Sequence, residues 1–201
     1  MTVVEIDRIA MAEESDSGLA PDQSALDKMF EMLDPISEGF KVEIVEGNIF
    51  MVPQRNTHWQ IIRRIVRALE DQFGEDVKVT SDVRFDFPGH LNGFCPDVVK
   101  LSDAAVLDKH GRWNAEDVEF IAEVISKGTA TNDYEPKKAV YAAAGIPVYL
   151  IVDPYTARCH AYTEPKDGEY HSKLTVVFGG DIDLTRTVLD LTLKTDTFPR
   201  D

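Results

Sequence analysis

The clearest pattern of apolar and polar positions lies in residues 118–153, VEFIAEVISKGTATNDYEPKKAVYAAAGIPVYLIVD. Residues 118–125 are mostly apolar and partly β-branched, which is typical of a buried strand. A polar loop leads into a predicted helix over residues 133–144, where Pro136 is tolerated in the first turn. Residues 148–152 form a second continuous apolar run. The pattern predicts two buried strands joined by a crossing helix, in the manner of a βαβ unit.

One charged residue, Glu123, interrupts the second half of the first strand. Alternate residues of a strand share a face, so Glu123 projects between two isoleucines. Because an unpaired buried carboxylate is costly, we expect a metal ion, a lysine or an arginine beside it. The helix offers Lys137 as the cation. Asp133, Lys137 and Tyr141 recur at helical spacing, so the three side chains lie along one face. The sequence therefore predicts a carboxylate and a lysine that face one cavity.

Two further elements are predicted before residue 55. Residues 24–33 have apolar side chains at helical spacing, and this short amphipathic helix docks either on the domain or on a second subunit. Residues 40–45 and 49–52 alternate as the two strands of a hairpin, and Glu43 lies in the first of them.

Residues 57–73 predict a longer helix with a continuous apolar stripe. The other side of this helix carries Arg63, Arg64 and Arg67, the densest basic cluster of the chain. This cluster is either a solvated face with local ion pairs or a surface for phosphate contact.

The remaining strands are predicted from shorter apolar alternations. They cover residues 77–87, 94–99, 158–162, 174–178 and 188–193. Asp97 enters the second of these directly after a proline, and a turn or capping role alone would account for it. We expect one domain over residues 23–201, preceded by a mobile acidic leader over residues 1–22.

The composition is typical of a soluble globular protein, with 43% hydrophobic and 28% charged residues. No apolar run approaches the length of a membrane span, and the N-terminal residues lack a secretory signal pattern. Cys95 and Cys159 have no CxxC spacing, so we expect neither a disulfide nor a zinc site and predict a cytoplasmic protein. The formal net charge of −15 excludes a broadly basic nucleic-acid-binding surface.

Asp97 and Glu123 suggest a specific chemistry if their strands are neighbours. Two carboxylates can share a hard cation such as Mg²⁺, with a backbone carbonyl and waters completing the shell. Lys137 could approach from the helix and orient a water or stabilise developing charge. These parts are sufficient for metal-assisted hydrolysis of a phosphodiester.

This pattern resembles the PD-(D/E)XK nuclease superfamily, and in particular its restriction endonuclease-like family of small cyanobacterial and actinobacterial proteins. The matching stretches lie between about residue 40 and residue 155, and their order and spacing carry the resemblance. They are VEIVEG at 42–47, His58, PDVV at 96–99, AEVIS at 122–126 and DYEPKKAVYAAAGIPVYLIVDP at 133–154.

The resemblance implies roles for individual residues. Asp97 and Glu123 match the metal-binding acids, with the backbone carbonyl of Val124 as a further ligand for Mg²⁺ or, as a substitute, Mn²⁺. The superfamily pattern usually has a lysine two residues after the second acid, where this chain has an isoleucine. In this family the lysine matches Lys137 on the helix, and Glu43 matches an acidic residue of the first hairpin.

The predicted fold is α/β (or α+β), with a bent mixed sheet of restriction endonuclease-like type, flanked by the helices at 57–73 and 133–144. An N-terminal hairpin and a helical leader precede this core. The predicted function is a Mg²⁺-dependent endonuclease that acts on DNA, as a homodimer and without membrane association. The alternatives are a non-catalytic interaction protein in which Glu123 and Lys137 form a buried ion pair, and a metal-dependent hydrolase of a small phosphate ester.

Overall fold

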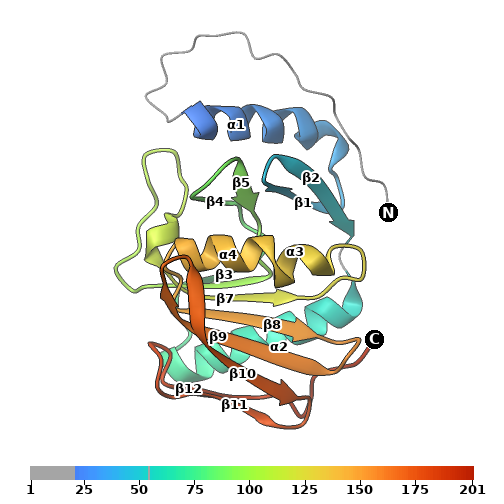
Figure 1. The fold of residues 1–201 in the computed structure, drawn as a ribbon, viewed down its shortest axis with the longest axis vertical. Helices are drawn as coiled ribbons and strands as arrows, with labels where there is room; N and C mark the ends of the chain where they lie inside the picture. Colours follow the sequence, from blue (N-terminus) through green and yellow to red (C-terminus); the bar gives the residue numbers. More distant parts are fainter. Residues whose placement is uncertain (1–20, 54) are drawn as a thin grey trace.

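The computed structural model describes residues 21–53 and 55–201 (Figure 1). The helices are α1 (Pro21–Leu33), α2 (Asn56–Phe73), α3 (Ala130–Tyr134) and α4 (Pro136–Ala143), with 3₁₀ turns at Asp34–Ile36 and Ala115–Asp117. The strands are β1 (Phe40–Val45), β2 (Asn48–Pro53), β3 (Val79–Thr80), β4 (Phe85–Phe87), β5 (Asn92–Phe94), β6 (Val98–Leu101), β7 (Val118–Val124), β8 (Val148–Asp153), β9 (Arg158–Lys166), β10 (Glu169–Val177), β11 (Asp181–Leu184) and β12 (Leu191–Lys194).

The described strands form three sheets. The central sheet has six strands in the order β10-β9-β8-β7-β6-β3, and a four-stranded sheet has the order β2-β1-β5-β4. β11 and β12 pair separately near the C-terminus. The central sheet is mixed, because β7 and β8 are parallel while their other neighbours are antiparallel. The predicted mixed α/β (α+β) class and the predicted N-terminal hairpin are confirmed.

The two faces of β7 carry different kinds of side chain, and this difference positions the functional site. Phe120, Ala122 and Val124 belong to the core cluster that contains the apolar stripe of α2. Ile121 and Ile125 belong to a second cluster, on the side of α4. Glu123 shares their face, because alternate residues of a strand point the same way.

The predicted helix over residues 133–144 is divided into α3 and α4. Glu135 separates them with φ −122° and ψ −82°, and Pro136 begins α4. Proline lacks the N–H that would continue the α3 hydrogen bonds, and it disfavours helical geometry in the residue before it. Pro136 is therefore the first residue of a new helix and does not lie within a continuous one.

The predicted strand over residues 77–87 is also divided. β3 joins β6 in the central sheet, whereas β4 joins β5 in the four-stranded sheet. Between them Asp82 has a φ of +56°, a left-handed conformation that interrupts a strand, and its N–H donates to the carbonyl of Pro96. This break brings Asp82 to the edge of the functional pocket described below.

The N-terminal helix packs on the same chain. α1 buries Leu26 and Leu33, and a Cβ placed on Gly93 of β5 would lie 2.7 Å from the Phe30 ring. Asp27 forms ion pairs with Arg84 and with Arg112. Figure 1 shows α1 lying along the four-stranded sheet. Of the two interpretations of this helix, docking on its own domain is the one observed.

Most of the predicted leader, residues 1–22, lies outside the described residues, and α1 begins at Pro21. The predicted strands at 158–162 and 174–178 correspond to β9 and β10, which pair as a hairpin and are longer than expected at nine residues each. Cys95 and Cys159 are free and buried. Within the described residues, no helix is long and apolar enough to cross a membrane.

The packing of α1 leads to a stability prediction. Leu26→Ala should lower the free energy of unfolding by about 2–4 kcal/mol, because a buried leucine side chain is removed from a packed contact. Met32→Ala on the same helix is the matched control, since Met32 is 55% exposed, and it should change stability by less than about 0.5 kcal/mol. Urea unfolding measures both. Equal effects of the two variants would show that α1 does not pack on the domain in solution.

Candidate functional site

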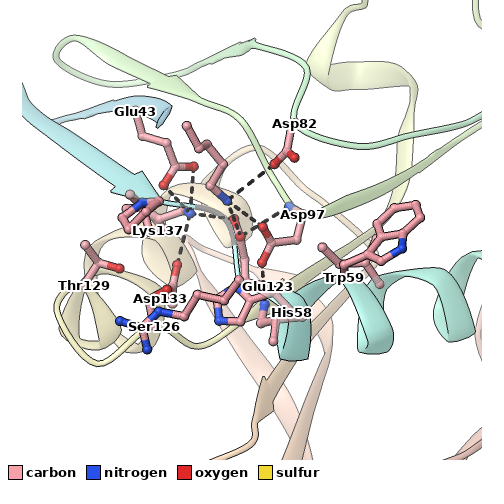
Figure 2. Close-up of a pocket in the computed structure, with 16 residues that line it drawn as sticks. Glu43, His58, Trp59, Asp82, Asp97, Glu123, Ser126, Thr129, Asp133 and Lys137 are labelled. Carbon is pink, nitrogen blue, oxygen red and sulfur yellow. Dashed lines mark hydrogen bonds and ion pairs between the residues drawn. The ribbon is translucent and has the colours of Figure 1, made fainter. Parts of the chain in front are cut away.

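A pocket lies where β1, the start of β6, the end of β7, α2 and the α3–α4 segment approach one another (Figure 2). Its lining is unusually rich in charge. The charged residues are Lys41, Glu43, Arg55, Asp82, Asp97, Glu123, Asp133 and Lys137. The structure thus brings together all four residues predicted as catalytic, although they come from segments far apart in the sequence.

Asp97 and Glu123 meet because β6 and β7 are antiparallel neighbours. Val98 pairs with Ala122, so the preceding Asp97 comes opposite Glu123. The N–H of Asp97 donates to Oε2 of Glu123 at 3.4 Å, and the N–H of Val124 donates to Oδ2 of Asp97 at 2.7 Å. Both side chains are buried. The backbone of two strands therefore fixes the separation of these carboxylates.

Lys137 reaches three carboxylates from the first turn of α4. Its Nζ lies 2.6 Å from Glu123, 3.0 Å from Glu43 and 3.0 Å from Asp133. Tyr141, one turn later, donates its hydroxyl to Oε1 of Glu123 at 2.7 Å. Across the break before Pro136, Lys137 and Tyr141 both contact Glu123, and Asp133 contacts Lys137.

Lys41 is a site residue that the sequence analysis missed. Its Nζ donates to Oδ1 of Asp97 at 2.6 Å and lies 3.7 Å from Oε2 of Glu123 and 3.9 Å from Asp82. The available signal was its position two residues before Glu43 on β1, because alternate residues of a strand share a face. Asp82 was missed as well, since its position depends on the break in the predicted 77–87 strand.

The buried carboxylates do not all have ordinary pKa values. Burial raises the pKa of Glu123 to about 8 and that of Asp133 to about 6. Burial also opposes ionisation of Glu43 and Asp97, but the nearby ammonium groups outweigh it and hold both pKa values below the usual range. Lys137 has a pKa well above its usual value, because its carboxylate partners outweigh the effect of burial. The ammonium of Lys137 therefore stays protonated near neutral pH.

The charge of the site favours a divalent cation. With its pKa raised to about 8, Glu123 keeps a proton near neutral pH in the metal-free pocket. Once Glu123 loses that proton, Glu43, Asp97, Glu123 and Asp133 carry two more negative charges than Lys41 and Lys137 neutralise, and a divalent cation would balance them. Carboxylate and carbonyl oxygens are the donors that Mg²⁺ prefers. Asp97 and Glu123 supply the carboxylates.

The backbone of Val124 lies on the correct side to supply a carbonyl. Its N–H points toward Asp97, and the N–H and C=O of one strand residue point to the same side. No group of three or more His, Cys, Asp or Glu side chains forms a metal cluster within residues 21–53 and 55–201. A cation here would therefore need the Val124 carbonyl or waters in its shell.

Other polar residues of the pocket have distinct environments. The buried hydroxyl of Ser126 has no hydrogen-bond partner among the described residues, so it is available to a ligand. His58 is buried, and its Nε2 lies 3.1 Å from the carbonyl of Ile125. Arg55 and Trp59 line the pocket with exposed side chains, and Trp59 is 57% exposed.

Three comparisons with known proteins bear on this site. The family described as "Uma2: Putative restriction endonuclease" matches residues 26–196. A solved structure described as that of a "putative nuclease belonging to DUF820" from Anabaena variabilis ATCC 29413 has a TM-score of 0.67 and 14% sequence identity, over 86% of this chain and 96% of that chain. At this identity the likeness shows a common fold. A comparison with curated proteins finds no match.

The raised pKa of Glu123 predicts a pH-dependent stability difference. Its pKa rises from 4.5 in the unfolded chain to about 8 in the folded protein. Between these two pH values the folded protein keeps a proton on Glu123 that the unfolded chain has released. The Glu123 contribution to stability is therefore present below pH 4.5 and is lost as the pH rises to 8. Relative to wild type, Glu123→Gln should gain about 1–3 kcal/mol in free energy of unfolding between pH 5 and pH 8.

Urea unfolding of both proteins in the presence of a chelator measures this gain. Because the comparison is a difference between two proteins, titrations of other groups largely cancel. A difference that stays constant from pH 5 to pH 8 would show that Glu123 ionises normally in the folded protein.

Proposed function

The chain belongs to the Uma2 family of "putative restriction endonucleases", and from this we propose that it is a Mg²⁺-dependent endonuclease that hydrolyses phosphodiester bonds in DNA. The proposal assigns Asp97, Glu123 and the Val124 carbonyl to the metal. It assigns Lys137 to the attacking water, with Glu43 in support. Family and fold support a nuclease, and the chemistry of the pocket supports the finer assignment.

One observation carries the proposal. Asp97, directly before β6, lies beside Glu123 of the neighbouring β7, and Lys137 contacts Glu123 in the same buried pocket. A protein that needed only a buried ion pair would need one carboxylate for this lysine. Instead the pocket concentrates more negative charge than its two lysines neutralise, which is costly unless a cation or bound protons compensate.

In the proposed hydrolysis, the protein side chains bind and orient the metal, and the metal activates the phosphate and the water. When bound, Mg²⁺ would polarise a phosphoryl oxygen and lower the pKa of a coordinated water. Asp97 is suited to remain an anionic ligand, since its pKa is lowered and the Val124 N–H holds one of its oxygens. Tyr141 orients Glu123 by donating to one of its oxygens.

Lys137 is suited to donate hydrogen bonds and is unsuited to act as a general base. Its three N–H groups face three carboxylates, and its raised pKa keeps it charged. Contact with an attacking water therefore requires one carboxylate to release an N–H. Glu123 is the partner that a metal would engage, whereas Glu43 and Asp133 would keep the ammonium in place.

DNA is the substrate that the rim of the pocket favours. Trp59 and Arg55 both line the pocket with exposed side chains, and the Arg55 guanidinium also contacts Tyr155 and Asp201. An exposed aromatic ring suits stacking on a base, and a guanidinium suits contact with a phosphate. Arg63 is exposed one turn after Trp59 on α2. We also propose a homodimer, because cleavage of both strands of a duplex needs two sites and each chain contributes one.

The net charge of −15 favours one rival, a hydrolase of a small phosphate ester. A large anionic polymer is repelled by an acidic surface, and a small ester is repelled less. Plasmid DNA, single-stranded DNA and a chromogenic phosphodiester therefore need to be compared as substrates under the same conditions.

Asp97→Asn should abolish the binding of Mn²⁺ measured by calorimetry, because a neutral amide replaces an anionic ligand. Metal-dependent cleavage of plasmid DNA should fall by at least about 100-fold. Asp153→Asn is the matched control, since Asp153 is a buried carboxylate at the end of β8 that does not line the pocket. Cleavage of only the chromogenic ester would favour the rival, and wild-type protein that binds no Mn²⁺ would refute the metal site.

Lys137→Met should reduce DNA cleavage by at least about 100-fold, because the charge that attends the water is lost. It should also lower the free energy of unfolding by about 3–5 kcal/mol, since Lys137 is only 1% exposed and its carboxylates lose their partner. Lys138→Met, the next residue on α4, is the matched control. Circular dichroism at a temperature where the variant remains folded separates the two effects, and full cleavage by folded Lys137→Met would overturn this role.

A further inference from the structure

Lys41 stands where the proposed function requires a metal ion. Its ammonium contacts Asp97 at 2.6 Å and approaches Glu123 at 3.7 Å, and these are the two carboxylates assigned to the cation. We propose that Lys41 and the divalent cation exchange: the ammonium holds Asp97 and Glu123 together until the cation arrives, and then transfers to Asp82. This inference rests on the proposed metal site and deepens it.

The geometry distinguishes the two lysines of the pocket. Lys137 contacts Glu123 through Oε1, together with Glu43 and Asp133. Lys41 approaches the other oxygen of Glu123, Oε2, and is the lysine that contacts Asp97. Lys41 therefore lies between the two proposed ligands, whereas Lys137 lies on the far side of one of them.

Electrostatics oppose the presence of both cations in one place. An ammonium and a divalent cation held by the same two carboxylates would repel each other strongly in a buried pocket. The arrangement also accounts for the lack of a ready three-ligand cluster in the part of the chain described, because Asp97 and Glu123 are organised around an amine. Lys41 thus acts as a positioning residue that keeps the carboxyl groups of Asp97 and Glu123 close before metal binding.

The structure offers the ammonium a second carboxylate close by. Asp82 lies 3.9 Å from the Lys41 Nζ, and both residues line the metal pocket as well as an adjoining pocket between β1 and the end of α1. Rotation of the flexible lysine stem would therefore move the amine within existing space. The break in the 77–87 segment, at the left-handed Asp82, is what places this carboxylate there.

The first test is a comparison of Mn²⁺ binding by calorimetry. Lys41→Met keeps the length and apolar character of the stem but removes the competing charge, so Mn²⁺ should bind at least about tenfold more tightly. Lys100→Met is the matched control, because Lys100 is also buried and paired with a carboxylate, Glu119, outside the pocket. Its affinity for Mn²⁺ should equal that of wild type.

Asp97→Asn in the Lys41→Met background should abolish the gain in affinity, which would locate the tighter binding at this site. In chelator, Lys41→Met should melt at a lower temperature than wild type. Saturating Mn²⁺ should raise its melting temperature by more than it raises that of wild type.

A second measurement uses the wild-type protein and does not depend on the stability of a variant. Crystal structures with a chelator and with Mn²⁺ should differ at Lys41. With Mn²⁺ bound by Asp97 and Glu123, the Nζ should lie beyond hydrogen-bond distance of Asp97 and beside Asp82. An ammonium that stays on Asp97 next to bound Mn²⁺ would overturn the exchange.

The outcomes separate this inference from the proposed function. If wild type binds Mn²⁺ and Lys41→Met binds it equally or more weakly, the exchange is wrong and the metal site stands. If neither protein binds Mn²⁺, the metal site itself is refuted and the exchange with it. Tighter binding by Lys41→Met that requires Asp97 supports both.

Discussion

The balance of buried charge at one end of β7 is the constraint on which the rest of the site depends. Glu123 lies on a strand inside the protein, with Asp97 beside it from the residue that precedes β6. Charges removed from water must be neutralised nearby, and here two lysines from different segments provide part of that neutralisation. In the metal-free pocket a proton on Glu123 reduces the remaining negative charge, because the pKa of Glu123 is raised to about 8. A pocket built for stability alone would have fewer acids or more bases.

The fold meets this constraint by using the two faces of one strand differently. On one face β7 packs its apolar residues against the stripe of α2, which anchors the strand. On the other face the same strand presents Glu123 to Lys137 of α4 and to Lys41 of β1. Because β7 lies inside the central sheet, with β6 and β8 on either side, the position of Glu123 is held by backbone hydrogen bonds. A rigid acid of this kind suits a site in which small displacements matter.

The negative net charge of the chain does not rule out an anionic DNA substrate, because the charge near the pocket matters more than the total. The formal charge of −15 is a property of the whole chain, and residues 1–38 alone contribute more than half of it. At the pocket itself, the exposed residues Arg55 and Trp59 are cationic and aromatic, whereas the buried charged residues beneath them are mostly carboxylates. An anionic substrate would meet these groups and the bound cation before the carboxylates beneath.

Much of the site could be predicted from the sequence because its signals are local. The alternation in residues 118–125 places Glu123 on one face of a strand, and the spacing of Asp133, Lys137 and Tyr141 places them on one helical face. The order of these motifs also indicated the family, which the match over residues 26–196 confirms.

Only the tertiary structure decided which distant segments meet. Lys41 looked like an ordinary polar residue of a hairpin, and it acquires its role only because β1 passes over Asp97. Asp82 appeared to lie within a strand, until the left-handed turn there directed β3 and β4 into different sheets. Periodicity reports how neighbours along a chain share a face. It carries no information about the contact between Lys41 of β1 and Asp97, which are more than fifty residues apart in the sequence.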